Sequence, residues 1–392
     1  MQRVLYLEHN TDGTVGGSHI CLLDICNHID KTKFQTIVCF FEKNSLVDEF
    51  LKSGAEVIFH QPPHPWRGYR FLPGIINRVI AFPINLINTL VFRVRAWARL
   101  LAEQQIDLVH INNACGYDHD LMLACRLKGI PCVVHERGIQ PNIDFRSRYF
   151  ANHSDGVIAI SDAVGNNLAH FGVREDRIIR INDSIDPDRL KIESTPAVIR
   201  KQFSIPLHAP LIGIVGNIKP WKGQLHVAQA IGILAKKQPE LHCIFVGHIA
   251  DQQYADEISQ LVKNMQLDDR VHFTGYQARP TEFMNAMDIV IHASIDPEPF
   301  GIVLLEAMSI GKPLIATAHG APLEIVVDGK TGYLVQPGDA ESLAEKILYL
   351  LDNPQIASDI AARGNQRLLE KYTIDRAIKK IESVYTRLLS QA

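Results

Sequence analysis

The residues most able to do chemistry stand in the segment HASIDPEPFGIVLLEAM (292–308), which carries two glutamates with seven residues between them. Its apolar start predicts the end of a strand, its two prolines stiffen an extended loop, and a helix is expected to begin after Gly301. Gly301 would let a ligand approach the backbone closely, and the free N–H groups of a first helical turn suit a diphosphate. Glu298 lies in the loop and Glu306 about one turn inside the helix. The two carboxylates can therefore accept hydrogen bonds from hydroxyl groups on different parts of one ligand, although two isolated glutamates would more often be solvated.

A second segment, GNIKPWKGQ (216–224), brings two lysines to the expected start of a helix. A strand is expected to end at Gly216, and Lys219 and Lys222 follow in a short turn. Cations before a helix start oppose the helix macrodipole unless an anion binds there. A bound phosphate would reverse that sign, and a lysine ammonium could neutralise charge on a departing diphosphate. The alternative is a surface turn with solvated lysines, and Trp221 is expected to pack rather than to stack.

Weaker signals follow strand ends in the first half of the chain. Gly16 and Gly17 stand at an expected helix start, where they can admit a phosphate or a sugar, although their segment is not the GxGxxG dinucleotide fingerprint. The segment VVHERG ends a strand with His135, Glu136 and Arg137. Three polar side chains at one strand end favour a role with substrate. A bare glycine turn and a structural histidine are the alternatives.

Short apolar, β-branched runs alternate with helical patterns along the chain. Strands are predicted in the first half at 3–9, 36–41, 107–112, 131–135 and 155–160, and in the second half at 211–216, 242–247, 271–275, 288–293 and 313–317. Strands that are apolar on both sides belong to buried parallel sheets, so two parallel α/β domains are expected. The turn-rich segment NDSIDPDRL (182–190) is the expected link, and DHD (118–120) is expected to cap the helix after it. Ligands of such domains bind where strands end and loops converge.

Composition excludes several classes of protein. The 392 residues include 40 Lys and Arg against 43 Asp and Glu, so a formal charge of −3 gives no global reason to bind nucleic acid. The seven cysteines form no CxxC pair, which fits small core residues in a reducing cytosol better than a zinc site. No run approaches the roughly 20 apolar residues that span a bilayer, and the start is too polar for a signal peptide. We therefore expect a soluble cytoplasmic protein.

One basic and apolar stretch stands out between the expected strands, over residues 66–101. Arginines alternate there with aromatic and aliphatic residues. Such a segment could lie on an anionic membrane surface, as a peripheral contact at the inner face of the membrane, or receive a lipid-linked acceptor. It could equally form helices packed within the first domain.

With these residues in place, the chain resembles the retaining GT-B glycosyltransferases of glycosyltransferase family 4. The resemblance covers essentially the full length. It rests on the two spaced glutamates, the PEPFG loop, the KG turn at Lys222-Gly223, the GAPLE segment ending at Glu324, and paired glycines 16 and 17. It implies two Rossmann-like, doubly wound parallel-sheet domains facing an interdomain cleft. The acceptor-side domain would span 1–186, the nucleotide-sugar-binding domain 187–373, and a helix within 374–392 would cross back to the first domain.

The resemblance also implies roles for the candidate residues. Glu306 would bind the ribose hydroxyls and Glu298 those of the transferred sugar, while Lys222 would stabilise the diphosphate leaving group. His135 would lie near the reacting face of the sugar. The remaining donor contacts would come from Gly16, Gly17, Gly216, Asn217, Lys219, Phe300, Gly301 and Ile302, and the acceptor side would include Asn112, Glu136 and Arg137. Family members of this kind need no bound metal. They also need no side-chain nucleophile, because the acceptor hydroxyl attacks from the same face as the departing diphosphate.

Three positions depart from the family pattern. Asn217 stands where relatives usually place an arginine, so one cation is missing unless Lys219 substitutes for it. Gly320-Ala321 replaces a commonly paired glycine, and the added methyl group could restrict approach to the backbone. Asp183-Ser184 replaces an Asn-Gly turn before the linker, which should affect only local geometry.

The resemblance thus implies retaining transfer of a sugar from a nucleotide diphosphate sugar to an acceptor hydroxyl. UDP is the commonest donor nucleotide among relatives, and the acceptor would be a glycan, a lipid-linked molecule or a small molecule. Two alternatives use the same fold. One is a non-catalytic nucleotide-sugar-binding subunit of a glycosyltransferase complex, which Asn217 keeps open, and the other is a sugar-nucleotide epimerase. A nicotinamide dehydrogenase is least favoured, because no GxGxxG opens either domain.

Overall fold

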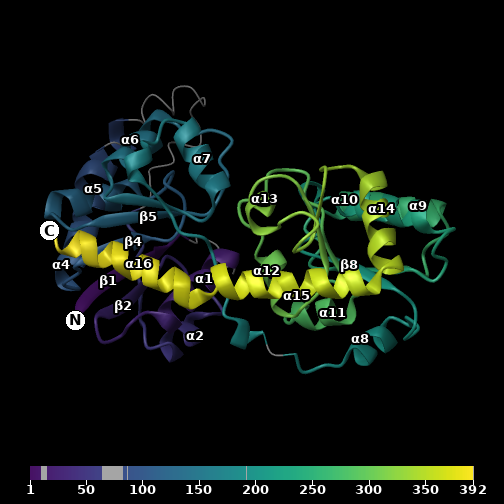
Figure 1. The fold of residues 1–392 in the computed structure, drawn as a ribbon. Helices are drawn as coiled ribbons and strands as arrows, with labels where there is room; N and C mark the ends of the chain where they lie inside the picture. The colour runs from purple at the N-terminus through teal and green to yellow at the C-terminus, as the bar shows by residue number, and fades with distance from the viewer. Residues whose placement is uncertain (10–15, 64–82, 86, 191, 392) are drawn as a thin grey trace. The chain divides into compact units, whose positions relative to one another are not determined.

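The chain folds into two compact units. The computed structural model describes residues 1–9, 16–63, 83–85, 87–190 and 192–391. Unit 1 comprises Met1–Asn182 and Ile374–Ala392, and unit 2 comprises Asp183–Thr373 (Figure 1). The sequence analysis placed the boundary after residue 186, whereas the compact units meet at residues 182 and 183.

Unit 1 is built on a seven-stranded parallel sheet in the order β3-β2-β1-β4-β5-β6-β7. Its strands are β1 (Gln2–Glu8), β2 (Phe34–Phe40), β3 (Glu56–Phe59), β4 (Leu108–Ile111), β5 (Cys132–Glu136), β6 (Gly156–Ala159) and β7 (Ile178–Arg180). Apolar side chains on both faces place β1 at the centre, where Val4–Leu7 are fully buried. The chain builds outward from β1 to β3 and then returns to the other side of β1 with β4. The strand order therefore reverses between β1 and β4.

The helices of unit 1 connect these strands. They are α1 (Gly17–His28), α2 (Val47–Lys52), the π-helical turn η1 (Asn88–Arg93), α4 (Val94–Glu103), α5 (His119–Lys128), α6 (Phe145–His153), α7 (Asp162–His170), η2 (Glu175–Arg177) and α16 (Ile374–Leu389). Although α16 is the last helix of the chain, it belongs to unit 1 and packs beside α1 (Figure 1). Its apolar stripe, which includes Ile381 and Tyr385, is buried in the unit 1 core.

Unit 2 repeats the same architecture with six parallel strands in the order β10-β9-β8-β11-β12-β13. The strands are β8 (Leu211–Val215), β9 (His242–Val246), β10 (Val271–Phe273), β11 (Ile289–His292), β12 (Leu314–Thr317) and β13 (Tyr333–Val335). The helices are η3 (Pro187–Arg189), α8 (Pro196–Gln202), η4 (Pro220–Lys222), α9 (Gln224–Leu234), α10 (Gln252–Asn264), α11 (Pro280–Ala286), α12 (Ile302–Ser309), α13 (Pro322–Ile325), α14 (Ala340–Asp352) and α15 (Pro354–Lys371). Here the strand order reverses between β8 and β11.

The prediction of two parallel α/β domains is confirmed, and each predicted strand is present with its ends shifted by a few residues. The strands that the sequence analysis missed, β3, β7 and β13, are short and lie at the sheet edges. Edge strands are half-exposed, so they lack the continuous apolar run by which the buried strands are recognised. All seven cysteines are free thiols and six of them are buried, as expected for core residues.

Candidate functional site

The candidate residues of unit 2 lie at the carboxyl ends of β8 and β11, on the two sides of the strand-order reversal. Ligands of doubly wound sheets bind at such switch points. The segment after β8 carries Gly216 and Lys222, and the segment after β11 carries Glu298 and Gly301. The topology therefore brings the two strongest sequence signals of unit 2 to one place.

An ion pair joins these two segments. Lys222 Nζ donates to Glu298 Oε2 over 2.7 Å, and both side chains are largely buried. The Ser294 hydroxyl donates to the same oxygen over 2.7 Å, and the His292 ring nitrogen Nε2 lies 3.0 Å from it. Glu298 Oε1 has no hydrogen-bond partner in the described part of the chain. That oxygen is free to accept from a ligand hydroxyl, while Oε2 holds the loop in place.

The charges of the pair are set by opposing effects. Burial raises the pKa of Glu298, but the hydrogen bond and charge of His292 and the ion pair with Lys222 outweigh it and hold that pKa well below its usual range. Burial lowers the pKa of Lys222, and the charge of Glu298 opposes this shift. One oxygen of Glu298 holds the buried Lys222 ammonium in place. A diphosphate that binds beside it would therefore meet a cation that is already positioned.

Both lysines of the turn lie over the same indole ring. Lys222 Nζ is 4.0 Å and Lys219 Nζ is 4.8 Å from the centre of the Trp221 ring. This intramolecular packing agrees with the expectation that Trp221 would pack, and the lysines gain a cation–π contact from it. The turn approaches β11 closely: a Cβ atom on Gly223, whose φ is +72°, would lie 2.0 Å from the Ala293 carbonyl oxygen. Only glycine fits there.

The position of the missing arginine is exposed. The Asn217 carbonyl accepts from Gln224 Nε2 over 3.0 Å, which fixes the backbone of the turn. Gly216 before it donates its N–H to Val246 over 2.9 Å. Asn217 thus contributes its backbone carbonyl to the contacts of the turn. Neither Asn217 nor Ile218 carries a positive charge, so Lys219 is the first cation after Gly216.

Helix α12 begins after Gly301, which adopts a left-handed backbone with φ +93°. The predicted helix start is therefore confirmed. The N–H groups of Ile302 and Val303 have no hydrogen-bond partner in the described part of the chain, so they are available to an anion. Phe300 is buried and its ring packs edge-on against Tyr372, 6.2 Å away. Its side chain anchors the loop.

Glu306 is a partly exposed acid without a hydrogen bond in the described part of the chain. Burial in the apolar helix raises the pKa of Glu306 to about 7, and the charge of Arg189 opposes this shift. A carboxylate without a protein partner that is also partly desolvated is suited to accept hydrogen bonds from ligand hydroxyls.

The third segment of unit 2, GAPLE, supports the Glu298 loop. Gly320 has φ +76°, and a Cβ atom there would lie 2.4 Å from the Glu298 carbonyl oxygen. Ala321 donates its N–H to that same carbonyl over 2.9 Å. The Glu324 carbonyl accepts from Arg367 and Tyr372, which ties the segment to α15. The segment positions Glu298 through backbone contacts.

In unit 1 the paired glycines lie at the start of α1, where Gly16 is the N-cap. A Cβ atom on either Gly16 or Gly17 would meet no described residue within 4 Å. Packing against the described part of unit 1 therefore gives no reason for glycine at these positions. Glu8, which the sequence analysis missed, is fully buried beneath this turn and accepts from Ser18 Oγ over 2.7 Å.

Asn112 lies at the end of β4 and is fully buried. Its amide nitrogen donates to Glu8 and to the Ser18 carbonyl, and its Oδ1 accepts from Arg137 Nη2 over 2.9 Å. Glu136 is also fully buried, where it accepts from the N–H of Cys115 over 2.9 Å and from Gln140 Nε2 over 2.9 Å. Burial raises the pKa of Glu136, and these hydrogen bonds oppose the shift. Asn112 and Glu136 thus hold Arg137 and the neighbouring loops in place.

His135 ends a chain of buried hydrogen bonds. Its Nδ1 lies 3.2 Å from His110 Nε2, His110 Nδ1 contacts the Tyr385 hydroxyl, and that hydroxyl lies 3.2 Å from the hydroxyl of Tyr6. Burial and the nearby charge of Arg137 hold the pKa of His135 well below its usual value, and they lower that of His110 to about 3. Both imidazoles are therefore neutral. His135 Nε2 is buried and has no hydrogen-bond partner in the described chain, which leaves it for a ligand.

The expectation that the DHD segment caps α5 is wrong. Asp118 precedes α5 but makes no capping bond. Its two oxygens instead lie 3.0 and 3.1 Å from Nδ1 of His9, just after β1. Asp120 accepts from Arg93 and Trp97. Neither His9 nor its pairing with Asp118 had a signal in the sequence, because the partners are far apart in the chain.

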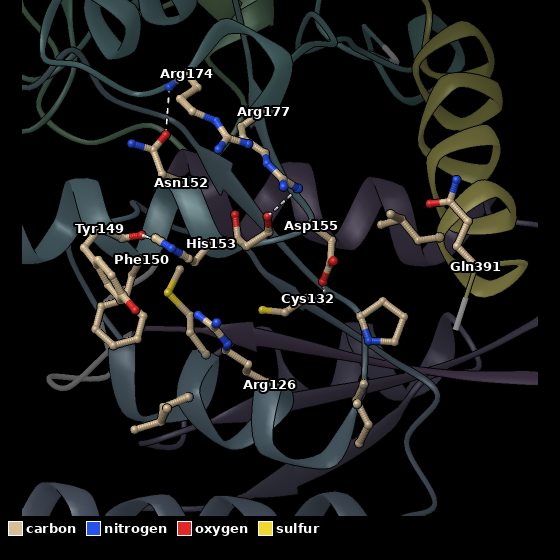
Figure 2. A pocket seen from close by; sticks show the side chains of 17 residues that line it. Arg126, Cys132, Tyr149, Phe150, Asn152, His153, Asp155, Arg174, Arg177 and Gln391 are labelled. Carbon is tan, nitrogen blue, oxygen red and sulfur yellow. Dashed lines mark hydrogen bonds between the residues drawn. The ribbon is translucent and has the colours of Figure 1, made fainter.

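A hollow of about 610 Å³ lies at the opposite edge of the unit 1 sheet, where β5 and β6 begin (Figure 2). Arg126, His153, Arg174 and Arg177 line it. Arg126 and His153 stand near the carboxyl ends of α5 and α6, where cations complement the helix macrodipole. Arg174 pairs with a neighbouring aspartate and Arg177 donates to a backbone carbonyl. The hollow lies at the amino ends of these strands, opposite the candidate residues of unit 1, so it is not part of the candidate site.

Of the basic stretch 66–101, residues 66–82 and 86 lie outside the described residues. In the described remainder, Trp97 is fully buried against Phe41 and His60, and Arg93 pairs with Asp120 over 2.8 Å. That part packs within unit 1, and membrane contact stays a prediction.

No helix among residues 1–9, 16–63, 83–85, 87–190 and 192–391 is long and apolar enough to cross a membrane. In those same ranges no group of three His, Cys, Asp or Glu side chains is placed to hold a metal ion. That the reaction needs no metal stays a prediction.

The two doubly wound units, each with polar residues at its switch point, define a GT-B fold. The structure of HepE from Anabaena in complex with UDP-glucose is similar to the whole chain, with a TM-score of 0.81, 24% identity, and coverage of 99% of this chain and 100% of that one. A family model for glycosyl transferases group 1 matches residues 197–367, and a model for glycosyltransferase family 4 matches residues 15–189. The chain therefore belongs to the family 4 (group 1) glycosyltransferases, and its general activity is glycosyl transfer.

Curated relatives differ in what they make. The chain is 26% identical over 301 residues to N-acetyl-alpha-D-glucosaminyl L-malate synthase of Bacillus anthracis, covering 74% of this chain and 77% of that protein. It is 28% identical over 216 residues to trehalose synthase of Pyrococcus horikoshii, covering 52% of this chain. The chain spans about half the length of that synthase, 51%. The family is shared, while the substrates of these relatives are their own.

Proposed function

We propose that this protein is a retaining glycosyltransferase that moves a sugar from a nucleotide diphosphate sugar, with UDP as the nucleotide, to the hydroxyl group of an acceptor. The observation that carries the proposal is the arrangement in unit 2. One ammonium, Lys222, is held by Glu298, and in the described part of the chain the first N–H groups of α12 and the Glu306 carboxylate have no hydrogen-bond partner. These groups match the diphosphate, sugar hydroxyls and ribose hydroxyls of one extended donor.

The proposed division of labour follows from charge. Glu306 accepts from the ribose hydroxyls, and Glu298 Oε1 accepts from a hydroxyl of the transferred sugar. Lys222 and the first turn of α12 stabilise the negative charge that develops on the diphosphate as the bond to the anomeric carbon breaks. Lys219 supplies the second cation in the absence of the arginine that Asn217 replaces. HepE, which was solved with UDP-glucose, supports this choice of donor.

The retaining course is proposed from the resemblance to retaining enzymes of the family, and the front-face route is favoured over a covalent intermediate because Glu298 is not suited to covalent chemistry. Glu298 is neutralised by Lys222 and three donors share its Oε2, so it is a poor nucleophile. The acceptor oxygen then forms its bond on the face from which the diphosphate departs. His135, a neutral imidazole with a free Nε2, hydrogen-bonds the sugar from unit 1, and no metal takes part.

A thermal-shift screen of UDP, GDP, ADP and TDP sugars tests the donor, because a ligand that binds only the folded state raises the melting temperature. A UDP sugar should give the largest rise. NMR of the product formed with an acceptor panel then tests the reaction, and retention of the anomeric configuration is the expected result. An inverted product would refute the retaining course. Binding without transfer or hydrolysis would favour a non-catalytic subunit, and a changed sugar without an acceptor would favour an epimerase.

A further inference from the structure

His292 ends strand β11 at the switch point of unit 2, six residues before Glu298. The rest of the strand, Ile289–Ile291, is apolar and buried, and the His292 side chain is only 3% exposed. Burying an imidazole on an apolar strand costs free energy unless its nitrogens find hydrogen-bond partners. The donor contacts proposed above give this residue no role, although a polar side chain at this place needs a reason.

Both ring nitrogens of His292 face oxygens of the site. Nε2 lies 3.0 Å from Glu298 Oε2 and 3.2 Å from Ser294 Oγ, and Nδ1 lies 3.4 Å from Thr317 Oγ1. The Ser294 hydroxyl donates to Glu298 Oε2 over 2.7 Å, and the Thr317 hydroxyl donates to the Ser294 carbonyl over 2.8 Å. An ionised carboxylate only accepts hydrogen bonds, so Nε2 carries a hydrogen and donates it to Glu298.

Three donors therefore share Glu298 Oε2, and they differ in what else they can reach. Lys222 donates over 2.7 Å, but in the proposed function its ammonium also meets the diphosphate. As negative charge develops on the leaving group, the ammonium is drawn toward it and its hold on Glu298 weakens. His292 and Ser294 are 3% and 1% exposed, so both act on the carboxylate from within the protein. Their contacts persist when the ammonium is shared with the ligand.

The charged and titratable groups around Glu298 come from three segments. Burial raises the pKa of Glu298. The hydrogen bond and charge of His292, from β11, oppose burial most strongly, and Lys222, from the η4 turn, adds to them, so the pKa lies well below its usual range. His319, from the segment after β12, directs its Nδ1 to the Ile295 carbonyl at 3.2 Å instead. Loss of His292 should therefore raise the pKa of Glu298.

We propose that His292 is the positioning residue of Glu298 and thereby determines how firmly the enzyme holds the transferred sugar. His292 fixes Oε2 and keeps the acid ionised, which leaves Oε1 for a sugar hydroxyl, and it touches neither donor nor acceptor itself. The inference rests on the proposed function and concerns unit 2 alone. It implies that the two halves of the donor can be separated: binding of the sugar depends on His292, and binding of the nucleotide does not.

The first experiment needs no ligand. NMR of isotope-labelled glutamate carboxyl groups follows the titration of Glu298 in the whole chain, and Glu298→Gln identifies its signal. In the parent, Glu298 should stay ionised down to the lowest pH at which the protein remains folded. In His292→Leu, which removes the donor, Glu298 should take up its proton within that range. An acid that stays ionised over the same range in both proteins would overturn the proposal, whether or not the enzyme transfers sugar.

The second experiment separates the sugar from the nucleotide. Calorimetry at pH 7 compares UDP-glucose with UDP, which lacks the sugar. In His292→Leu the Kd for UDP-glucose should rise about tenfold or more, because a misplaced carboxylate loses its charged hydrogen bond to the sugar. The Kd for UDP should change less than about twofold. Equal weakening of both ligands would overturn the proposal, because His292 would then only support the fold of the site, and unchanged affinity for both would do the same.

His292→Gln tests whether the hydrogen bond itself matters. The amide nitrogen of glutamine reaches about as far as Nε2 of histidine and can donate to Glu298. This variant should bind UDP-glucose within about threefold of the parent. An affinity as low as that of His292→Leu would show that shape, and not donation to Glu298, is what the site requires, and the proposal would fail.

His242→Leu is the matched control. His242 is also a buried histidine of this sheet, 8% exposed, and its Nδ1 lies 3.1 Å from His272 Nε2. It begins β9, so in a parallel sheet it lies at the edge opposite Glu298. The variant should leave both affinities within about twofold of the parent, and a selective loss of UDP-glucose binding here would overturn the proposal. If UDP-glucose and UDP bind to neither the parent nor the variants, the proposed function fails, while the titration of Glu298 still decides the role of His292.

Discussion

The two units place their polar residues at equivalent points of equivalent sheets, yet they assemble them differently. In unit 2 a single segment after β11 supplies Glu298, the unpaired start of α12 and Glu306. In unit 1 the corresponding groups, His9, Asn112 and His135, come from the ends of three different strands. Arg137 links Asn112 to His135, while His9 pairs separately with Asp118. A site made from one segment keeps its spacing in the sequence. A site made from dispersed residues exists only in the folded sheet.

The difference has a physical consequence for mutation. We propose that the acids and the cation of unit 2 bind the donor, so substitutions there should change catalysis more than folding. Several polar groups of unit 1 satisfy one another, so substitutions there should affect folding and catalysis together.

The largest effect is expected from Lys222→Ala. The variant removes the ammonium that meets the diphosphate and leaves Glu298 with two of its three donors. Loss of one preorganised charge of this kind costs about 100-fold or more in kcat. Steady-state kinetics with the donor identified by screening measures it. Lys219→Ala is the comparison, because Lys219 also lies over Trp221 but pairs with no carboxylate in the described part of the chain. As the proposed second cation, its loss should lower kcat less than the loss of Lys222. A normal kcat in Lys222→Ala would refute the role of Lys222, and a normal kcat in Lys219→Ala would refute Lys219 as the second cation.

A smaller effect is expected from the titration of Glu306. Its pKa is raised to about 7 by burial, and ribose hydroxyls need its ionised form as acceptor. Affinity for a UDP sugar should therefore fall about tenfold between pH 8 and pH 6, since the ionised fraction falls by about that factor. Calorimetry with UDP-glucose measures it without interference, because the phosphates of a diester do not titrate in this range. Glu306→Gln should flatten the dependence, and a parent protein with constant affinity would contradict the assignment.

The titration of Glu306 should also make the stability of the unliganded protein depend on pH. Its folded pKa lies above the ordinary value, so the stability that its neutral form contributes is present below about pH 4.5 and is lost as pH rises through about 7. Denaturant unfolding of the parent and of Glu306→Gln should therefore diverge across this window, with the glutamine variant losing less.

The contrast between a site made from one segment and a site made from dispersed residues also explains which features could be predicted from the sequence. The helix start at Gly301 and the lysine turn were predicted because glycine, proline and apolar periodicity act locally. Glu8 and His9 were missed because a polar residue after an apolar run carries no mark of what it will meet. Asp118 was misassigned to a cap because a capping residue and an Asp that turns back to another strand look alike in sequence. Edge strands such as β3 were missed because half of their surface is exposed.

A lesser effect is expected from Tyr385→Phe, which tests whether α16 supports unit 1 chemistry. The Tyr385 hydroxyl is a buried partner of His110, which in turn contacts His135. Its loss leaves one ring nitrogen of His110 unsatisfied, which costs about 1–3 kcal/mol of stability. We expect a fall of about threefold to tenfold in kcat. His135 keeps its contact with His110, but His110 loses the Tyr385 hydroxyl that holds it in place. Denaturant unfolding and kinetics measure the two effects.

The control for this variant is Tyr6→Phe, which removes only the outer hydroxyl of the same chain. Its effects on stability and kcat should be smaller, because Tyr385 still contacts His110. If Tyr385→Phe lowered stability without any change in kcat, the buried chain would be structural only, and His135 would not depend on it.

The smallest effect is expected from Ala321→Gly, which restores the glycine pair usual among relatives. The added methyl group was expected to restrict approach to the backbone. However, the Ala321 N–H already donates to the Glu298 carbonyl over 2.9 Å, and φ is an ordinary −65°. The variant should therefore change donor affinity less than about twofold and lower stability by about 0.5–1 kcal/mol through greater backbone freedom. Calorimetry and unfolding measure both.

Gly320→Ala provides the contrast one residue earlier. Its Cβ atom would stand 2.4 Å from the Glu298 carbonyl oxygen at φ +76°, so the Glu298 loop must move. Transfer should fall more than about tenfold there, while Ala321→Gly leaves it unchanged. If instead Ala321→Gly raised donor affinity several-fold, the alanine would obstruct the ligand directly, and its contact with Glu298 would have to open when the donor binds. The glycine that matters at this turn is therefore the one that makes room for Glu298.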